Sequence, residues 1–284
     1  MRTLSYEIVD VFTDRPFAGN PLAVVFGADE LSRDQMQGLA REFNLSETVF
    51  VLPPTVEGAT YRARIFTPAA EQPFAGHPSV GVAVTQMLRG VFGPGVVRQE
   101  CGAGVLPIEV HDDGRATLTG GPPTLGPELD PAPLLAAAGL VAADFAGPPP
   151  RVAGCGLEFP YLSVRPDAVP RSRPDPAGTD VVVFAWDAAQ RRAHTRVFVP
   201  GLGVPEDPAT GSAALGFGVW LVAVGLVPGD GPSSYVIRQG VELHRPSILE
   251  CSLEAAAGAV VRVSVTGSVV RVAAGEIAIP PFVG

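Results

Sequence analysis

Polar and apolar residues alternate along much of this chain, which predicts a protein built mainly of β-strands. The alternation starts in the N-terminal segment MRTLSYEIVDVF. Short runs rich in β-branched and aromatic residues, separated by Gly- and Pro-rich turns, continue it to the end of the chain. The predicted strands are residues 6–12, 22–26, 47–52, 61–66, 96–100, 105–110, 116–120, 161–164, 181–186, 195–198, 235–239, 248–253, 260–266, 269–273 and 276–279.

Helical spacing of apolar residues occurs in fewer places. Residues 31–43 show it on one face only, which predicts an amphipathic helix, and residues 134–139 suggest a short one. Residues 79–88 and 212–224 are apolar on nearly every side, so we expect two helices that are buried all round. The longest apolar stretch, 213–227, is shorter than the roughly 18–20 residues that a membrane-spanning helix needs.

One segment of the chain is repeated. RIFTP, beginning at Arg64, matches RVFVP, beginning at Arg196, at an offset of 132 residues, and Gly76 matches Gly211 at an offset of 135. A strand, a Pro-rich loop, a Gly-containing turn and an apolar helix therefore occur once in each half. Because a repeated unit of this size indicates duplication, we predict an α+β fold of two pseudo-symmetric lobes. Each lobe would be a mostly antiparallel, barrel-like sheet wrapped around its central apolar helix.

The lobe boundary is predicted from composition. The segment GGPPTLGPELDPAP, residues 120–133, is rich in proline and glycine, as linkers between domains often are. The last predicted strand can return to the first lobe. We therefore predict one lobe from residues 1–120 with 274–284, and the other from residues 121–273.

The turn before each apolar helix carries the candidate chemistry. Gly76 and Gly211 allow a ligand to approach the backbone closely, and the N-terminus of a helix attracts carboxylates. If the two turns face one another, they form a receptor for a small carboxylic acid. The alternative is that these glycines only let each helix pack tightly against its sheet.

The polar residues of the two turns differ. PFAGH ends at His77, whereas EDPATGS contains Asp207 and ends at Ser212, and counting from the strand ends places Asp207 at the level of Ala75. His77 and Asp207 can hydrogen-bond one ligand and shift its protonation. The alternative for His77 is a capping or packing role, and for Asp207 and Ser212 it is helix capping.

Two glutamates precede the first of these turns. Glu47 lies in NLSETVFVL at the start of a predicted strand, where Ser46 and Glu47 could also serve as backbone caps or exposed edge residues. Glu71 is a second candidate acid, which we interpret as part of the loop scaffold. Nothing in the tetrapeptide around Glu47 by itself proves catalysis.

Composition excludes several classes of function. The net charge is −9 and the calculated pI is about 4.9, which argues against nucleic acid and anionic membranes as partners. All 20 basic residues are arginine, so the lysines of pyridoxal-phosphate enzymes and of P-loops are absent. The four histidines are scattered without metal-ligand spacing, and there is no GxSxG or helix-opening GxGxxG motif. We therefore expect no cofactor and no metal.

Cysteine usage predicts the compartment. Cys101, Cys155 and Cys251 are far apart, and no CxxC motif is present. An odd, scattered set is typical of reduced thiols in a cytoplasmic protein. The N-terminal segment alternates like a strand and does not resemble a signal peptide.

Five segments, in order along nearly the whole chain, resemble the PhzF family of phenazine-biosynthesis isomerases. They are PFAGNPLAVVF, NLSETVFVL, RIFTPAAEQPFAGHPSVG, VPEDPATGSAA and RQGVELHRPSILE. The resemblance implies a diaminopimelate-epimerase-like fold, which agrees with the repeat, and a homodimer. It also implies a cofactor-independent isomerase that shuttles a proton on a small carboxylic acid, of the trans-2,3-dihydro-3-hydroxyanthranilate type.

The resemblance also implies roles for individual residues. Glu47 corresponds to the family's general acid/base, and burial between two lobes would raise its pKa toward the working pH. His77 and Asp207 would be the other catalytic residues. The residues implied to bind the substrate are Ser46, Gly76, Gly211 and Ser212.

Two other functions remain open. Related epimerases use one cysteine at each helix mouth, but those levels carry Ala75 and Asp207 here, which disfavours a two-thiol racemase. An epimerase could instead use Glu47 with Asp207 or His77. The third possibility is a binding protein that keeps the ancestral cleft without catalysis.

Overall fold

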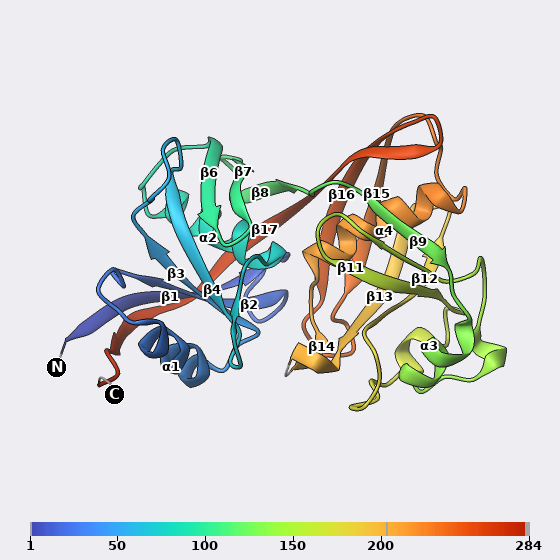
Figure 1. Ribbon diagram of the computed structural model, residues 1–284, viewed down its shortest axis with the longest axis horizontal. Helices are drawn as coiled ribbons and strands as arrows, with labels where there is room; N and C mark the ends of the chain where they lie inside the picture. The colour runs from blue at the N-terminus through green and yellow to red at the C-terminus, as the bar shows by residue number, and fades with distance from the viewer. Residues whose placement is uncertain (1, 203, 282–284) are drawn as a thin grey trace. The chain divides into compact units, whose positions relative to one another are not determined.

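The computed structural model describes residues 2–202 and 204–281, and it divides into two compact units (Figure 1). Unit 1 comprises residues 1–118 and 267–284, and unit 2 comprises residues 119–266. These boundaries lie a few residues before the predicted ones, at 118 in place of 120 and at 266 in place of 273. The chain therefore enters unit 2 ahead of the Pro/Gly-rich segment, and much of the long last strand belongs to unit 1.

Unit 1 is a closed barrel of eight strands around the helix α2. Its elements are β1 (Thr3–Val11), β2 (Asn20–Phe26), α1 (Arg33–Phe43), β3 (Glu47–Leu52), β4 (Tyr61–Phe66), β5 (Glu71–Gln72), α2 (Gly76–Leu88), β6 (Gly95–Cys101), β7 (Gly104–Val110), β8 (Arg115–Thr119) and the second part of β17 (Ala259–Ala278). The barrel order is β17-β1-β2-β3-β4-β6-β7-β8 and back to β17. The pairs β2–β3 and β4–β6 are parallel, and the other pairs with a described register are antiparallel.

Unit 2 repeats this arrangement. Its elements are β9 (Thr124–Glu128), α3 (Pro131–Ala137), β10 (Arg151–Gly154), β11 (Glu158–Ser163), β12 (Val181–Asp187), β13 (Arg192–Val199), β14 (Val204–Asp207), α4 (Gly211–Ala223), β15 (Gly231–Gln239), β16 (Ser247–Ala256) and the first part of β17. Three short 3₁₀ turns are Ala142–Asp144, Val169–Arg171 and Pro200–Leu202. The parallel pairs β11–β12 and β13–β15 correspond to those of unit 1. The sequence repeat and the predicted fold class are therefore confirmed.

The central helices are buried, as their apolar sequences predict. α2 packs against β1, β2, β3 and β7, and α4 packs against β9, β10, β11 and β16. Glycines permit the close approach: a Cβ at Gly81 would lie 2.5 Å from the Leu22 side chain, and one at Gly216 would lie 2.4 Å from the Tyr161 hydroxyl oxygen. That hydroxyl donates to the Ala213 carbonyl oxygen at 2.7 Å. Burial of the whole circumference explains why neither helix has a polar face.

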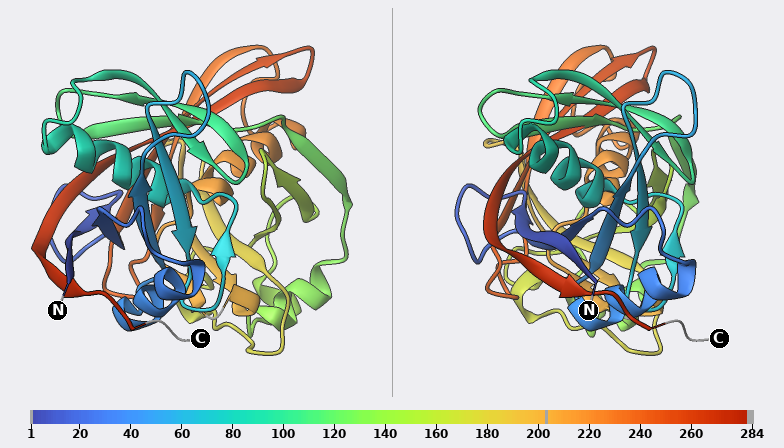
Figure 2. Two further views of the ribbon diagram at one scale, coloured as in Figure 1. Left: turned by 60° about the vertical axis from the view of Figure 1, so that its left-hand side comes forward. Right: turned by 90° about the vertical axis from the view of Figure 1, so that its left-hand side faces the viewer.

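Helix α1 is amphipathic and lies on the outside of its barrel. Ser32 and Gln35 form a capping box at its N-terminus, which moves the helix start two residues past the predicted 31. The apolar face packs on β3 and β4, and the Gln35 side-chain amide donates to the Pro280 carbonyl oxygen. Figure 2 shows α1, in blue, beside the C-terminal segment.

The end of the chain differs from the prediction. Residues 260–266, 269–273 and 276–279 form one 20-residue strand, β17, where three were predicted. Glycines suggested breaks there, but they serve close packing within the strand. A Cβ at Gly267 would lie 2.2 Å from the Phe12 ring, and one at Gly275 would lie 3.0 Å from the Tyr6 hydroxyl oxygen. The short strands β5, β9, β10 and β14 were not predicted. Each has at most five residues and lies beside prolines or glycines.

We expect Gly216→Ala to lower the free energy of unfolding by about 1–3 kcal/mol, the usual cost of overpacking a core. The added methyl group would meet the Tyr161 hydroxyl and, at 2.9 Å, the Ala153 carbonyl oxygen. Gly93→Ala is the control, because nothing lies within 4 Å of a Cβ at Gly93. Urea denaturation measures both variants, and equal midpoints would contradict the packing role of Gly216.

Candidate active site

The turn that precedes α2 is held by an ion pair at the barrel edge of unit 1. The Arg64 guanidinium on β4 donates to both carboxylate oxygens of Glu71 on β5, at 2.7 and 2.8 Å, and Arg33 also contacts Glu71 at 3.1 Å. Hydrogen bonding from Arg64 lowers the pKa of Glu71. A carboxylate held ionised between two arginines is a poor proton donor, so the structure supports the scaffold interpretation of Glu71.

His77 lies in the first turn of α2 and is neutral. Its side chain is only 4% exposed, and burial lowers its pKa from 6.5 to about 3. Nδ1 lies 3.2 Å from the side-chain amide nitrogen of Asn20, which begins β2. Among residues 2–202 and 204–281, none hydrogen-bonds the buried Nε2. Because its pKa is near 3, the ring stays neutral near neutral pH, which suits a hydrogen-bonding role better than proton transfer.

Glu47 lies beside this histidine. It begins β3, three residues after Asn44, whose left-handed conformation (φ 50°) ends α1. A Glu47 carboxylate oxygen lies 3.6 Å from His77 Nδ1, and the Glu47 side chain is 18% exposed. Because His77 is neutral, this contact is not an ion pair. Two of the three predicted catalytic residues are thus brought together, and the half-buried Ser46 directly precedes Glu47 in the chain.

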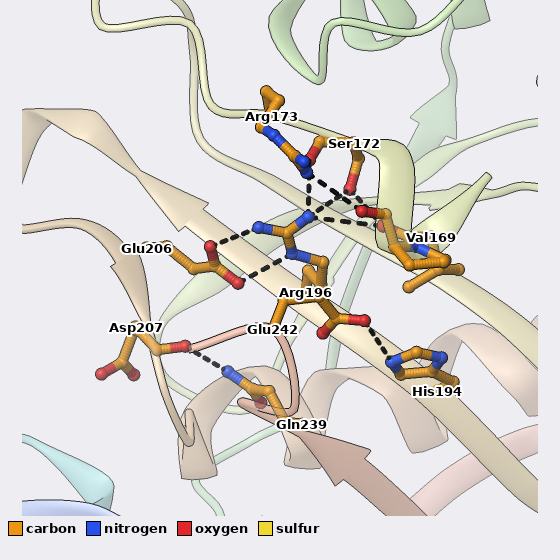
Figure 3. A network of polar contacts seen from close by, with 10 residues as sticks. Val169, Ser172, Arg173, His194, Arg196, Glu206, Asp207, Gln239 and Glu242 are labelled. Atoms are coloured by element: carbon orange, nitrogen blue, oxygen red, sulfur yellow. Dashed lines mark hydrogen bonds and ion pairs between the residues drawn. The ribbon is translucent and has the colours of Figure 1, made fainter. Parts of the chain in front are cut away.

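The corresponding turn of unit 2 is held by a buried ion pair, shown in Figure 3. Arg196 on β13 donates to both carboxylate oxygens of Glu206 on β14, at 2.8 and 2.6 Å. Arg196 also donates to the Ser172 carbonyl oxygen at 2.5 Å. Arg196 and Glu206 repeat Arg64 and Glu71, but with side chains only 4% and 7% exposed.

The strand register corrects one prediction about Asp207. In unit 2, Val197 pairs with Asp207 across β13 and β14, and in unit 1 Ile65 pairs with Gln72 across β4 and β5. Asp207 therefore corresponds to Gln72, and Ala75 was the wrong counterpart. The three-residue insertion lies before Glu206, so the earlier count, which started from the strand end, missed it. The residue at the level of Ala75 is Thr210.

The mouth of α4 is polar and buried. Gly211 and Ser212 begin the helix, and Ser212 is buried. Thr210 occupies the N-cap position but makes no side-chain cap hydrogen bond within the described chain; its hydroxyl donates to Asp207 Oδ2 at 2.6 Å. Helix α2 likewise has no side-chain cap, since Ala75 is its N-cap residue and Gly76 its first. Asp207 precedes the N-cap position by three residues, and its carboxylate accepts from the Thr210 hydroxyl group.

Three polar residues of these clusters were not predicted. They are Asn20 beside His77, and Thr210 and Gln239 beside Asp207. All three lie within segments that carried the family resemblance, in PFAGNP, DPATGS and RQG. No local rule distinguishes them from ordinary turn residues, because Asn20 meets His77, and Gln239 meets Thr210, only in the folded chain.

None of the three cysteines occupies the position directly before α2 or α4. Burial raises the pKa of Cys155 to about 11 and also raises the pKa values of Cys101 and Cys251. The mouth positions are Ala75 and Thr210, so a two-thiol racemase remains disfavoured after the corrected register. No group of three or more His, Cys, Asp or Glu side chains in the described part of the chain could hold a metal ion.

A family model confirms what these turns indicate. The model PhzC-PhzF, described as phenazine biosynthesis-like protein, matches residues 9–275. The chain belongs to this family. Several of its relatives are named as isomerases, and the protein is accordingly an isomerase of the PhzF type.

Individual relatives cover the whole molecule. The trans-2,3-dihydro-3-hydroxyanthranilate isomerase of Pseudomonas aeruginosa is 37% identical, over 93% of this chain and 95% of its own. An uncharacterised isomerase of Mesorhizobium japonicum is 38% identical, over 98% and 99%. The crystal structure of a Bacillus anthracis PhzF-family protein has a TM-score of 0.88 at 25% identity and covers 98% of this chain and 100% of its own. Solved amino-acid epimerases and racemases at 16% identity share the fold alone.

Several expectations are not tested by these observations. Four statements stay predictions. They are that the two turns face one another, that the protein is a homodimer, that it is cytoplasmic, and that it needs no cofactor. Within the described residues, no helix combines the length and the apolar character needed to cross a membrane.

The neutral His77 predicts a pH dependence of stability. The unfolded histidine binds a proton near pH 6.5 and the folded one only near pH 3. The unfolded state therefore holds more protons between these values, and stability falls as the pH falls through this window. His77→Asn should remove a slope of up to about 1.4 kcal/mol per pH unit between roughly pH 6 and pH 4. Denaturation at several pH values measures the free energy of unfolding of both proteins. If it changes with pH to the same extent in wild type and variant, His77 is not held neutral in the folded protein.

Proposed function

We propose that the protein is a cofactor-independent isomerase that moves a proton between two carbons of a small carboxylic acid, with Glu47 as general acid and base. The single observation that carries the proposal is the Glu47 carboxylate beside the buried, neutral His77 at the mouth of α2. The relatives named for trans-2,3-dihydro-3-hydroxyanthranilate support a cyclic, unsaturated amino-hydroxy acid as substrate.

The proposed reaction conserves every atom of the substrate. The Glu47 carboxylate takes a proton from one carbon, and the electron pair of the broken C–H bond shifts the double bonds of the substrate. The protonated Glu47 then returns that proton to another carbon. The resulting enol converts to a ketone by tautomerisation. One carboxyl group thus serves as base and then as acid, which requires no co-reactant.

The other site residues are proposed to bind and orient. His77 stays neutral and hydrogen-bonds the substrate, which limits the charge beside Glu47. The first-turn amides that follow Gly76 and Gly211 suit a carboxylate, since in the described part of the chain neither N-cap residue, Ala75 or Thr210, makes a side-chain cap hydrogen bond. Ser46 and Ser212 offer hydroxyl groups. Asp207 accepts hydrogen bonds from an amino or hydroxyl group.

An epimerase of the same fold is the second candidate, supported by a Pseudomonas aeruginosa protein named as a predicted epimerase, which is 33% identical to this chain. It differs in the fate of the proton. In deuterated buffer, an epimerase labels the stereocentre that it inverts, whereas the proposed isomerase places deuterium on a carbon that did not lose a proton. Mass spectrometry with NMR of the product distinguishes these outcomes.

We expect Glu47→Gln to lower kcat roughly 10²- to 10⁴-fold, the usual contribution of a general acid/base. The amide keeps the shape of the side chain but cannot accept the substrate proton. Affinity for 3-hydroxyanthranilate, the aromatic counterpart of the relatives' substrate, should change little and is measured by calorimetry.

Glu71→Gln is the matched control, because Glu71 is the other candidate acid of this region and is bound by Arg64. It should keep most of the wild-type kcat when assayed well below its melting temperature. Equal losses in both variants would mean that Glu47 is not the shuttle. Ligand binding without turnover in any assay, including wild type, would favour the binding-protein alternative.

A further inference from the structure

A chain of hydrogen bonds reaches Asp207 from the end of β15. The Gln239 side chain is 1% exposed. Its Nε2 donates to the Asp207 carbonyl oxygen at 2.8 Å and to Thr210 Oγ1 at 3.0 Å, while its Oε1 accepts from the Thr210 backbone amide at 3.2 Å. Figure 3 shows the first of these contacts. All four groups of this cluster belong to unit 2.

The backbone decides which way the Gln239 amide points. An N–H can only donate and a carbonyl oxygen can only accept. The Thr210 N–H therefore requires Oε1 of Gln239, and the Asp207 carbonyl oxygen requires Nε2. With the amide orientation determined, its second N–H must point at the Thr210 hydroxyl oxygen.

The same logic determines the direction of the Thr210 hydroxyl group. Its oxygen accepts from Gln239, so its only hydrogen is directed to Asp207 Oδ2, at 2.6 Å. A threonine at an N-cap position ordinarily turns its oxygen to the first helical amides. Thr210 does not do so, although it is the N-cap residue of α4. The usual capping contact is replaced by one that holds a carboxylate.

We propose that Thr210 and Gln239 are positioning residues for Asp207, and this rests on the proposed function, in which Asp207 contacts the substrate. Gln239 orients the Thr210 hydroxyl, and that hydroxyl donates to the Asp207 carboxylate and holds it in one orientation. The Asp207 carboxylate then acts as a hydrogen-bond acceptor for the substrate. The substrate class is therefore a carboxylic acid that also bears an N–H or O–H donor.

A purely structural role for this cluster is the alternative, and the chain supplies a control for it. Ser247 is fully buried and donates to the Pro208 carbonyl oxygen at 3.0 Å. It thus ties the same loop to the next strand, one residue from Asp207. No hydrogen bond described here joins Ser247 to Asp207 or Thr210. Ser247→Ala loosens the loop and leaves the hydroxyl relay intact.

The first experiment needs no activity. Crystal structures of wild type, Thr210→Val, Gln239→Glu and Ser247→Ala report the side-chain torsions of Asp207. We expect the Asp207 carboxylate to rotate or split into two conformers in the first two variants and to stay as in wild type in Ser247→Ala. Gln239→Glu keeps the size of the side chain but replaces the donor with an acceptor. Unchanged torsions in Thr210→Val and Gln239→Glu would overturn the proposal.

The second experiment measures kcat and KM with trans-2,3-dihydro-3-hydroxyanthranilate. A lost hydrogen bond to a charged group predicts roughly a 10- to 100-fold lower kcat/KM for Thr210→Val. Thr210→Ser should restore most of it, because serine keeps the hydroxyl. Gln239→Met combined with Thr210→Val should be no worse than Thr210→Val alone, since Gln239 acts through that hydroxyl. Ser247→Ala should keep kcat/KM within a few fold.

The outcomes separate the two proposals. Active wild type with an equally active Thr210→Val overturns the positioning role and leaves the isomerase proposal standing. Additive losses in the double variant also overturn it, because they indicate two independent structural effects. Inactive wild type overturns the proposed substrate. In that case, the Asp207 torsions in the crystal structures alone decide whether Thr210 and Gln239 position the carboxylate.

Discussion

Close packing of one apolar helix inside each sheet is the constraint on which the rest of this structure depends. A helix that is buried all round leaves no exposed polar face, and the free backbone amides at its N-terminus then need partners from the neighbouring loops or from a ligand. Gly81 and Gly216 allow each helix to touch the surrounding strands directly. The first-turn amides of α2 and α4 then lie beside the polar side chains of the neighbouring loops. The candidate chemistry is accordingly found at the two helix mouths.

An arginine–glutamate pair holds the loop before each mouth, yet the two pairs differ in environment. The Arg64–Glu71 pair is partly exposed and shared with Arg33, so solvent weakens it. The Arg196–Glu206 pair is buried and further bonded to the Ser172 carbonyl oxygen. Loss of one partner of a buried pair leaves an uncompensated charge, which costs about 3–5 kcal/mol. The second turn is therefore held more tightly than the first.

The two mouths carry different neighbours for a carboxylate on a similar backbone. The mouth of α2 combines a carboxylate with a histidine that burial keeps neutral, which suits a group that gives and takes a proton. At the mouth of α4, the Asp207 carboxylate accepts from the Thr210 hydroxyl group, and the Asp207 carbonyl oxygen accepts from the Gln239 amide. In the proposed function, the first carboxylate transfers the proton and the second binds the substrate.

The sequence by itself determined the duplicated α+β architecture, the two buried helices and the residues at their mouths. Periodicity and an internal repeat can be read directly from the sequence, because they do not depend on which distant residues are in contact. The tertiary structure alone decided the level of Asp207, the continuity of β17 across Gly267, and the roles of Asn20, Thr210 and Gln239. Each of these depends on a partner far along the chain: Gln72 and Asp207 through strand register, Gly267 through the Phe12 ring, and Gln239 through Thr210. Side-chain hydrogen bonds and strand register are set by packing in space, which no local pattern of residues encodes.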